Sequence, residues 1–537
     1  MPSVVTIGVY GFNLEAFLET LARAGARLVV DVRDRRAVRG AEYAWANAAR
    51  LQAALALVPA GVAVAGPKTT AGQPTGAERT LQRYAEDTWA SFAAMTDDDS
   101  GLPSDRLNVD GTLAVQTSTT NIGSYMWSAV VAERLGIIDR AELVGRLSTT
   151  LATLESMERH GPSGQYFNWY DHRTGEKLTT WPPSGDPLVP HLSSVDNGWL
   201  ATALQVVRGA VPELAHRAGP LYRAMDFGLY YVPERNLIAR TFIPETGEKP
   251  CCYDTLGEVR IASWIGIGRG QIPRRHYFGP WRTFPDSCDW SWQFAKPVGE
   301  WRRYLGVDVF EGAYEYRGME IVPNWGGSMF EALMVPLFVP EEDWGRRSWR
   351  VNHPLFVRAQ IEHGLEEARY GYWGFSPADV PEGGYRTYGV PWLGLDPGGY
   401  PSNNDSTIPE PGFEGCPDGD PEPLPGPDDY TNGVVTPHAS FLALRWAPDE
   451  VIENLANLEQ DFDIYGGWGF RDSVNVDTGT VAESHLSLDQ GMIMASIGNH
   501  LGDDILRRAF VTPRFKARLR PLMAIERFAN FRPGRRP

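Results

Sequence analysis

Apolar side chains recur every three or four residues along most of the chain after Thr80, which is the spacing of one face of an α-helix. The segments with this spacing are 80–96, 121–136, 139–158, 195–209, 212–230, 256–268, 327–338, 354–369, 437–446, 448–460, 487–501 and 503–510. Most of them come in pairs, separated by long loops rich in glycine and aromatic residues. Paired helices in this number predict a mainly α protein, an (α/α)6 toroid in which helical hairpins close into a ring.

The first 58 residues have a different pattern. VVTIGVY and ARLVVDVR are typical of buried strands, and LEAFLETLARAG between them is an amphipathic helix, so the segment begins as βαβ. VDVRDRRAVRGAEYAWANAARL resembles the opening of a small bacterial domain of unknown function (number 488), and the resemblance stops near Val58. We therefore expect a truncated α/β segment at 1–58, to which we assign no chemistry.

The remaining boundaries follow from composition. GPKTTAGQPTGAER has no apolar period and indicates a linker, which we place at 59–79. The helical domain is then expected at 80–515, followed by a basic C-terminal tail at 516–537. Residues 396–433 are rich in Pro, Gly and Asp and predict a long functional loop. PDGDPE within it offers oxygen ligands, so a calcium ion stays open there; no other cofactor and no catalytic metal are expected.

Charge and composition exclude several classes of function. The chain has 67 Asp+Glu against 50 Lys+Arg, a net charge of -17, which argues against a nucleic-acid partner. It has no apolar run of the ~20 residues that a membrane span needs. The N-terminus lacks the pattern of a signal peptide, so the chain as written is cytoplasmic, and we expect a monomer. The 18 Trp, 21 Tyr and 22 Phe favour a sugar partner, because aromatic rings offer flat apolar faces with polar edges.

Alternate helices begin with a conspicuous polar residue followed by an apolar stretch. These residues are Thr120, Asp196, Glu258, Glu331, His438 and Asp489. A single acid at a helix start is explained by capping and by the helix dipole. The repetition is explained better by a toroid, whose inner helices run parallel and bring their N-termini to one rim. Carboxylates gathered at such a rim suit the cleavage of an acetal.

Aromatic, acidic and glycine residues also recur together in the loops, which indicates a polysaccharide groove. The residues expected to bind substrate are Asn168, Trp169, Trp290, Trp325, Trp373, Asp379, Glu382, Tyr385, His438 and Asp489. Four cysteines have no zinc spacing, and we expect free thiols. The sequence also lacks a P-loop, an HExxH motif and a GxSxG motif.

Nine ordered motifs between Arg83 and Phe510 resemble the glycoamylase-like domain family. They are TSTTNIG, YFNWYDHRTGEKL, SSVDNGWLA, GEVRIASWIGIGRGQIPRRHYF, GGSMFEALMVPL, YWGFSPADVPEGGYRTYGVPWLGL, GVVTPHASFLAL, GWGFRDSVN and SLDQGMIMASIGNHLG. This family includes endo-β-1,2-glucanases of glycoside hydrolase family 144 and the C-terminal domain of cyclic β-1,2-glucan synthases. The resemblance implies an (α/α)6 fold, a β-glucan substrate and an exported protein, and the last conflicts with the N-terminus.

The resemblance also implies roles for particular acids. The family's motif acids match Asp196, Glu258, Glu331, Asp472 and Asp489 in this chain. Three positions depart from the family pattern. Gly257 replaces a Ser or Thr, Arg471 replaces a Tyr, and Pro377 stands where the synthases have a glutamate.

We therefore predict a glycoside hydrolase, most simply an endo-acting enzyme on β-1,2-glucan. Glu258 is the expected proton donor and Asp472 the expected base or nucleophile, with Asp196 and Glu331 completing the catalytic set. The alternatives are a hydrolase of another glucan linkage, a lyase or isomerase, and a non-catalytic glycan-binding protein. The last would be favoured if arginines such as Arg260 or Arg386 neutralised the acids.

Overall fold

The computed structural model describes residues 28–30, 63–65, 75–283, 297–394 and 433–531. The chain divides into two compact units, residues 1–75 with 532–537, and Gly76–Phe531. In the smaller unit, β1 (Leu28–Val30) and β2 (Ala63–Ala65) pair in parallel. β1 lies in the predicted second strand, whereas β2 lies inside the predicted linker, so regular structure extends past Val58. The rest of the 1–58 segment lies outside the described residues.

The larger unit is mainly helical, and six of its helices have more than three quarters of their residues buried. These six buried helices are α4 (Thr119–Arg134), α6 (Ser194–Ala210), α8 (Arg260–Arg269), α9 (Met329–Leu333), α12 (Pro437–Leu442) and α14 (Ser487–Leu501). The other helices are α3 (Gly76–Met95), α5 (Arg140–Ser156), α7 (Ala215–Ala224), α10 (Glu341–Trp344), α11 (Trp349–Glu362), α13 (Pro448–Asp461), α15 (Ile505–Phe510) and α16 (Pro513–Ile525).

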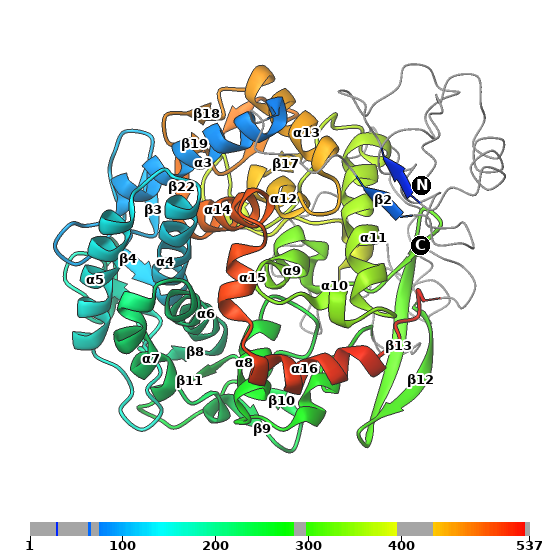
Figure 1. Ribbon diagram of the computed structural model, residues 1–537, viewed down its shortest axis with the longest axis horizontal. Helices are drawn as coiled ribbons and strands as arrows, with labels where there is room; N and C mark the ends of the chain where they lie inside the picture. Colours follow the sequence, from blue (N-terminus) through cyan, green and yellow to red (C-terminus); the bar gives the residue numbers. More distant parts are fainter. Residues whose placement is uncertain (1–27, 31–62, 66–74, 284–296, 395–432, 532–537) are drawn as a thin grey trace, which may run out of the picture. The chain divides into compact units, whose positions relative to one another are not determined.

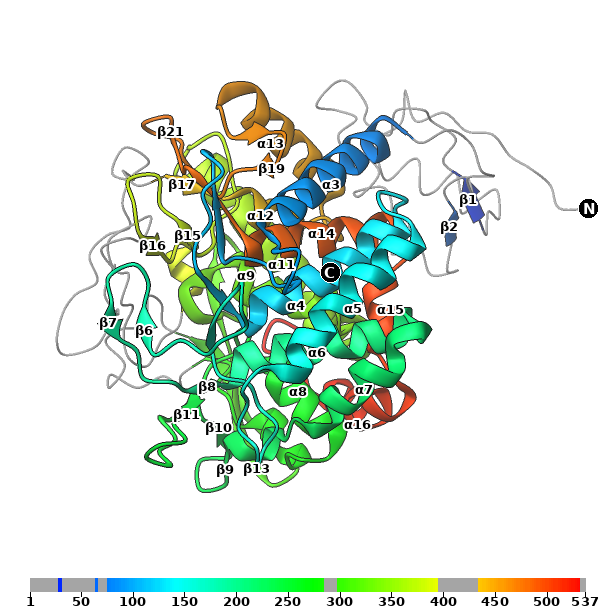
Figure 2. The same ribbon diagram turned by 90° about the vertical axis from the view of Figure 1, so that its left-hand side faces the viewer.

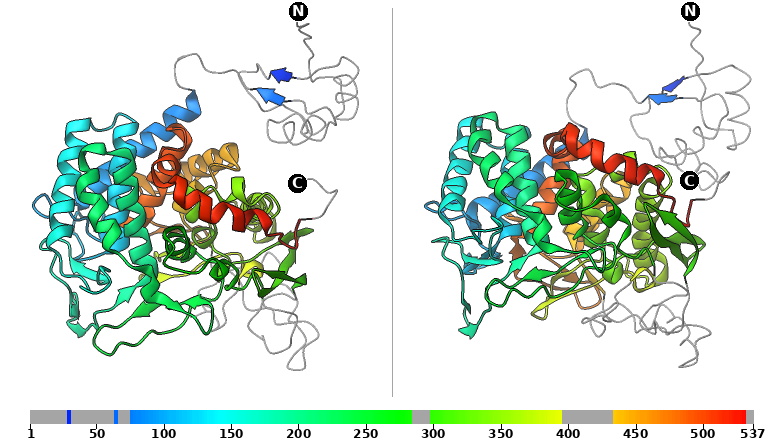
Figure 3. Two further views of the ribbon diagram at one scale, coloured as in Figure 1. Left: turned by 60° about the horizontal axis from the view of Figure 1, so that its bottom comes forward. Right: turned by 90° about the horizontal axis from the view of Figure 1, so that it is seen from below.

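The six buried helices contact one another in a closed order. α14 packs on α4, α4 on α6 and α6 on α8, while α9 packs on α12 and α12 on α14 (Figure 1). The Arg260 guanidinium joins α8 to α9 by donating to the backbone carbonyl of Glu331 at 2.8 Å. α5 and α7 pack on the outside of α4 and α6, and Figure 3 shows these four helices side by side.

Short strands precede four of the six buried helices and lie at their N-terminal ends. β4 (Gln116–Ser118), β8 (Leu192–Ser193), β17 (Val434–Val435) and β22 (Ser484–Leu486) lead directly into α4, α6, α12 and α14. Figure 2 shows the short strands on one side of the unit, with α5, α7 and α15 on the other. The N-termini of the buried helices therefore face a surface made of loops and small strands.

The remaining short strands form small ladders around these loops. They are β3 (Arg106–Asn108), β5 (Trp169–Asp171), β6 (Thr180–Trp181), β7 (Asp186–Pro187), β9 (Tyr231–Val232), β10 (Leu237–Ile238), β11 (Thr241–Phe242), β15 (Ala378–Asp379), β16 (Tyr385–Arg386), β18 (Tyr465–Gly466), β19 (Gly469–Phe470), β20 (Val474–Asn475) and β21 (Thr480–Val481). The pairs β3–β22, β4–β5, β8–β11, β15–β16 and β18–β19 are antiparallel.

One antiparallel sheet was not predicted from the sequence. It consists of β12 (Val298–Tyr304), β13 (Val307–Tyr316) and β14 (Met319–Ile321). Two-residue turns join its strands, and both residues of each turn have positive φ: 48° and 84° in the first turn, 48° and 77° in the second. Turns of this kind match the twist of a hairpin, and a glycine at the second position is the sequence signal for them. In this chain the pairs Leu305-Gly306 and Arg317-Gly318 supply this signal.

Every predicted helical segment overlaps an observed helix, whereas α10 and α16 were not predicted. The segment at 327–338 contains only five residues of α-helix and then a 3₁₀ turn, because Pro336 has no N–H to continue the α-helical hydrogen bonds. The predicted tail is wrong as far as Phe531, since α16 buries Phe515, Leu519 and Leu522 against the domain. No helix in the described ranges combines the length and apolar character required to cross a membrane.

Candidate active site

The N-terminal ends of the buried helices bring the predicted polar residues together. Ser118, Ser193 and Ser328 cap α4, α6 and α9 by accepting the backbone N–H three residues later. Asp196, in the first turn of α6, accepts a hydrogen bond from the Thr120 hydroxyl at 2.6 Å. The caps fix where each helix starts, so the polar residue of each first turn points to the same loop-covered end.

Glu258 and Glu331 form the first carboxylate pair. The Glu258 backbone N–H donates to Glu331 Oε2 at 2.7 Å, and the Trp199 indole N–H donates to the Glu258 carboxylate. Burial and the negative charge of Glu331 raise the pKa of Glu258 well above its usual value. Burial also raises the pKa of Glu331 to about 7, against the opposing effects of the Glu258 N–H and Arg260. Burial and the Glu331 charge therefore both favour the protonated form of Glu258.

Gly257 allows this pair to form. A Cβ atom at position 257 would lie 2.3 Å from Glu331 Oε2, closer than any van der Waals contact permits. The Ser or Thr of the family pattern would push the Glu331 carboxylate away from the Glu258 N–H. The departure at position 257 therefore shapes the pair rather than removing it.

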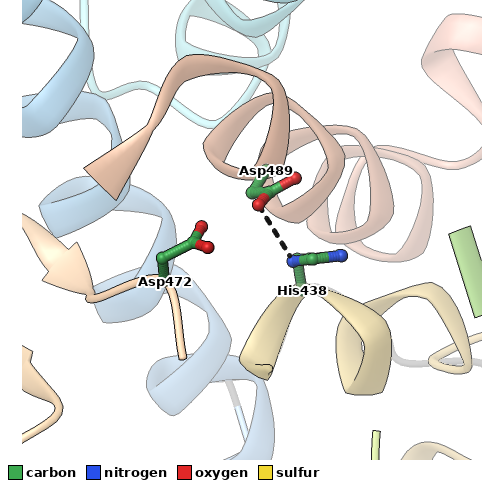
Figure 4. Close-up of side chains that lie close together, drawn as sticks. All are labelled: His438, Asp472 and Asp489. Atoms are coloured by element: carbon green, nitrogen blue, oxygen red, sulfur yellow. Dashed lines mark ion pairs between the residues drawn. The ribbon is translucent and has the colours of Figure 1, made fainter. Parts of the chain in front are cut away.

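Asp472 and Asp489 form the second carboxylate pair, and His438 lies beside it (Figure 4). All three side chains are buried, with exposures of 1–2%. A hydrogen bond between the two carboxyl groups lowers the pKa of Asp472 and raises that of Asp489. Burial sets the pKa of Asp472 at about 7 and that of Asp489 well above its usual value. Asp489 is therefore the proton-bearing member and Asp472 the first to ionise.

His438 is neutral and serves as a hydrogen-bonding support. Burial lowers its pKa to about 3. Its Nδ1 lies 2.7 Å from the Thr436 hydroxyl, which itself donates to the Asp472 carbonyl at 2.6 Å. The same Nδ1 lies 3.4 Å from Asp489 Oδ2. Because the Thr436 hydroxyl is already used as a donor, Nδ1 carries the hydrogen.

The residues that orient Asp472 were only partly predicted. The Asp379 backbone N–H donates to Asp472 Oδ2 at 2.6 Å. The Asp379 carboxylate is held by Arg106 at 2.7 Å and by the Ser484 hydroxyl. Asp105 is held by Asn121 at 2.7 Å and raises the pKa of Asp489 further. The sequence analysis missed Asp105, Arg106 and Ser484, which belong to no helix start and to no loop rich in aromatic residues.

Tyr385 connects the two carboxylate pairs. It lies on β16 with 53% of its surface exposed. Desolvation and then the charges of Asp489, Asp472 and Glu258 raise the pKa of its hydroxyl well above the usual value. Charges from both pairs therefore reach one phenol, which agrees with the position of Glu258, Glu331 and Asp489 at the N-terminal ends of α8, α9 and α14.

A chain of polar contacts joins the aromatic residues to α6. With the Asn168 amide oriented to satisfy both neighbours, its nitrogen donates to Asp196 Oδ2 at 2.8 Å and its oxygen accepts from the Trp169 indole at 2.9 Å. The Trp181 ring stands edge-on to Trp169, with centroids 5.0 Å apart. Asn168 and Trp169 thus lie beside Asp196 and Trp181, and their role in sugar binding stays a prediction.

The other predicted sugar-binding residues differ in their exposure to solvent. Glu382 is exposed and accepts from Asn475 at 3.2 Å, and Trp325 is half-buried. Trp373 is 1% exposed and lies in the core, where its carbonyl accepts from Ser440 and Asn454. A buried indole has no free face for a sugar, so the structure does not support that role for Trp373. Trp290 lies outside the described residues.

One group could hold a metal ion among the residues that the structure describes. Ligand atoms of His438, Asp472 and Asp489 lie within 4.8 Å of one another. A shared proton accounts for the same pair of carboxyl groups, so we assign no metal. The PDGDPE run considered for calcium lies outside the described residues. Cys251 and Cys252 form a disulfide, so free thiols were wrong for this pair.

The main arginine expected to neutralise the acids does not pair with them. Arg260 donates to both carboxylate oxygens of Glu341, at 2.9 and 3.0 Å. Its remaining donors reach the backbone carbonyls of Gly257, Glu331 and Ala332. The Glu258 and Glu331 carboxyl groups are therefore left for chemistry.

Comparisons with known proteins relate this chain to the glycoamylase-like family. The family model described as "Putative glucoamylase" matches residues 295–513, and that of a protein of unknown function (DUF3131) matches 83–228. These ranges begin at Arg83 and end beyond Phe510, but they leave 229–294 unmatched, where the motif GEVRIASWIGIGRGQIPRRHYF lies. The resemblance to the glycoamylase-like family is thus confirmed.

Individual relatives agree with this family. The chain is 27% identical over 326 residues to the cyclic β-(1,2)-glucan synthase NdvB of Rhizobium meliloti, which covers 57% of this chain but only 9% of that protein. An endo-β-1,2-glucanase from Chitinophaga pinensis matches with a TM-score of 0.59 at 17% identity, over 84% of this chain and 98% of the other. A β-1,2-glucanase from Parabacteroides distasonis matches with a TM-score of 0.61 at 15% identity, over 84% and 61%. At these identities the likeness shows the fold.

Proposed function

We propose that this protein is a glycoside hydrolase with an (α/α)6 toroid, and that it cleaves the chain of a β-1,2-linked glucan internally. The observation that carries the proposal is the placement of Glu258, Glu331 and Asp489 at the starts of α8, α9 and α14, with Asp472 beside Asp489. Glycoside hydrolysis needs one protonated and one ionised carboxyl group flanking the scissile bond. The linkage rests on the glucanases and the glucan synthase that the chain resembles.

Glu258 is the proton donor in this proposal. Its carboxyl group is protonated at neutral pH, because burial and the Glu331 charge oppose ionisation, and it gives its proton to the leaving glycosidic oxygen. The Trp199 indole N–H then stabilises the carboxylate that remains. Glu331 has two tasks: it anchors the Glu258 backbone and raises the pKa of the Glu258 carboxyl group.

Asp472 is the base or nucleophile. Its carboxylate takes a proton from the attacking water, or attacks the anomeric carbon itself. Two donors, Asp489 and the Asp379 N–H, favour its ionised form against burial. Asp196, held by Thr120 and Asn168, and the rings of Trp169 and Trp325 are assigned to the sugar hydroxyls and sugar faces.

The test is an assay of the purified chain on linear β-1,2-, β-1,3-, β-1,6- and α-1,4-glucans, with products sized by mass. We expect oligosaccharides from the β-1,2-glucan, each gaining one water per bond. Glu258→Gln and Asp472→Asn should each lower kcat by about 10²–10⁴-fold. Glu453→Gln and Asp449→Asn, which change exposed acids of α13, are the matched controls.

The outcomes separate the rival functions. Cleavage of another glucan would correct the linkage alone, and products without added water would indicate a lyase. Tight oligosaccharide binding with no turnover would favour the non-catalytic alternative. Wild-type rates in both site variants would overturn the assignment of Glu258 and Asp472.

A further inference from the structure

A pocket of about 300 Å³ lies next to the second carboxylate pair and is not used by the proposed mechanism. It is formed by the turn between β18 and β19, by β22 and by the loop after β3. Its lining residues are Val109, Gly466, Gly467, Trp468, Arg471 and His485. Nothing in the roles assigned so far requires an opening at this place.

The pocket is joined to the base by β22 and by the segment between β19 and β20. Arg471 directly precedes Asp472, and the Asp472 backbone N–H donates to the Ser484 carbonyl at 2.9 Å. His485 follows Ser484, whose hydroxyl holds the Asp379 carboxylate. A ligand in the pocket would therefore contact residues adjacent in sequence to those that orient Asp472.

An indole and open space provide a surface for a flat ring. The half-buried Trp468 stands at 90° to the His485 ring, with centroids 6.1 Å apart. No atom lies within 4 Å of a Cβ placed on Gly466 or Gly467, so the turn leaves free room. A pyranose ring binds to such an apolar face through its C–H groups while its hydroxyls reach polar neighbours.

Polar groups complete the pocket. His485 is 3% exposed, and burial lowers the pKa of its ring to about 4, so the ring is neutral and lines the pocket as a hydrogen-bonding group. Arg471 pairs with Asp463 at 3.2 Å, but the Asp463 side chain is 86% exposed, so the guanidinium keeps donors for a ligand. The position that departs from the family's Tyr thus supplies hydrogen-bond donors here.

We propose that this pocket binds a glucosyl unit of the glucan at a distance from the bond that is cleaved. The inference rests on the proposed function, since it assigns a part of the same substrate. Trp468 provides the stacking face, and Arg471 and His485 bind hydroxyl groups. The pocket would make long chains better ligands than short ones.

The test compares Trp468→Ala with wild type, Trp468→Phe, and Trp301→Ala as the matched control. Trp301 lies on β12 and is 56% exposed. Binding to linear β-1,2-glucan is measured first by affinity electrophoresis, which needs no turnover. We expect Trp468→Ala to weaken binding about tenfold, Trp468→Phe to restore most of it, and Trp301→Ala to bind as wild type does.

Kinetics then distinguish the two proposals. On the long glucan Trp468→Ala should raise KM about tenfold and change kcat less than about twofold, with a smaller rise in KM on sophorotriose. Unchanged glucan binding, or an equal rise in KM on both substrates, would overturn the proposed role of the pocket. Either result would leave the proposed hydrolase activity intact. Weakened binding in a protein that cleaves no glucan would support the pocket and overturn the hydrolase. Wild-type protein that the glucan does not retard would contradict the pocket outright.

Discussion

The two carboxylate pairs keep a proton by different means. In the Glu258–Glu331 pair the two carboxyl groups share no hydrogen bond: Glu331 accepts from the Glu258 backbone and acts on the Glu258 carboxyl group through its charge. In the Asp472–Asp489 pair the carboxyl groups bond to each other directly, and Asp489 supplies the proton. The first arrangement raises the pKa of the functional member, and the second lowers it.

This difference separates the roles of donor and base on physical grounds. A donor must stay protonated at the working pH, which a nearby negative charge and burial ensure. A base must ionise although it is buried, which it does by accepting hydrogen bonds. Glu258 meets the first requirement, and Asp472, with donors from Asp489 and Asp379, meets the second.

Removing the Glu331 charge should change the contrast between the two pairs most, because it lowers the pKa of the proposed donor Glu258. Glu331→Gln keeps an oxygen to accept the Glu258 N–H but deletes the charge that raises the pKa of Glu258. A donor with a lower pKa loses its proton earlier, so the alkaline limb of kcat/KM should move down by about one pH unit. The pH–rate profile measures this. An alkaline limb that stays in place would show that Glu331 does not tune the donor.

The second pair should respond in the opposite sense on the acid side. Asp489→Leu removes the hydrogen bond that lowers the pKa of Asp472, so that pKa rises above about 7. The rate depends on ionised Asp472, and the acid limb of kcat/KM should therefore move up by about one unit. Asp489→Asn still offers an N–H donor and serves as the control, with a smaller shift. Equal shifts in both variants would contradict the donor role of Asp489.

The smallest effect is expected from Gly257→Ala. The added methyl group displaces the Glu331 carboxylate, which is the flexible end of a side chain, so the loss of thermal stability should be small. Loss of the 2.7 Å hydrogen bond to the Glu258 N–H should lower kcat/KM by less than about tenfold. Thermal unfolding and steady-state kinetics report the two quantities separately. A large fall in stability with unchanged kinetics would show that Gly257 serves only packing.

The helices were predictable because each has a long apolar face, and their N-termini because capping residues are local signals. Asp196, Glu258, Glu331 and Asp489 were found from these signals alone. Arg106, Asp105 and Ser484 were not, since they reach the site through the pairing of β3 with β22, between residues 376 to 380 positions apart. The predicted sugar-binding role of Trp373 was wrong for a related reason. Loop composition does not tell whether an indole faces the solvent or the core.

The assignment of donor and base is tested most directly by changing the leaving group. In a 2,4-dinitrophenyl β-glycoside of a β-1,2-linked gluco-oligosaccharide, the leaving group is dinitrophenolate, which departs without being protonated. Cleavage of its bond to the sugar therefore needs the base or nucleophile but not the donor. In the first turnover Glu258→Gln should then release dinitrophenolate at a rate close to that of the wild type, while Asp472→Asn should lose as much activity as on the glucan. Equal losses by both variants on this substrate, or a loss confined to Glu258→Gln, would contradict the account.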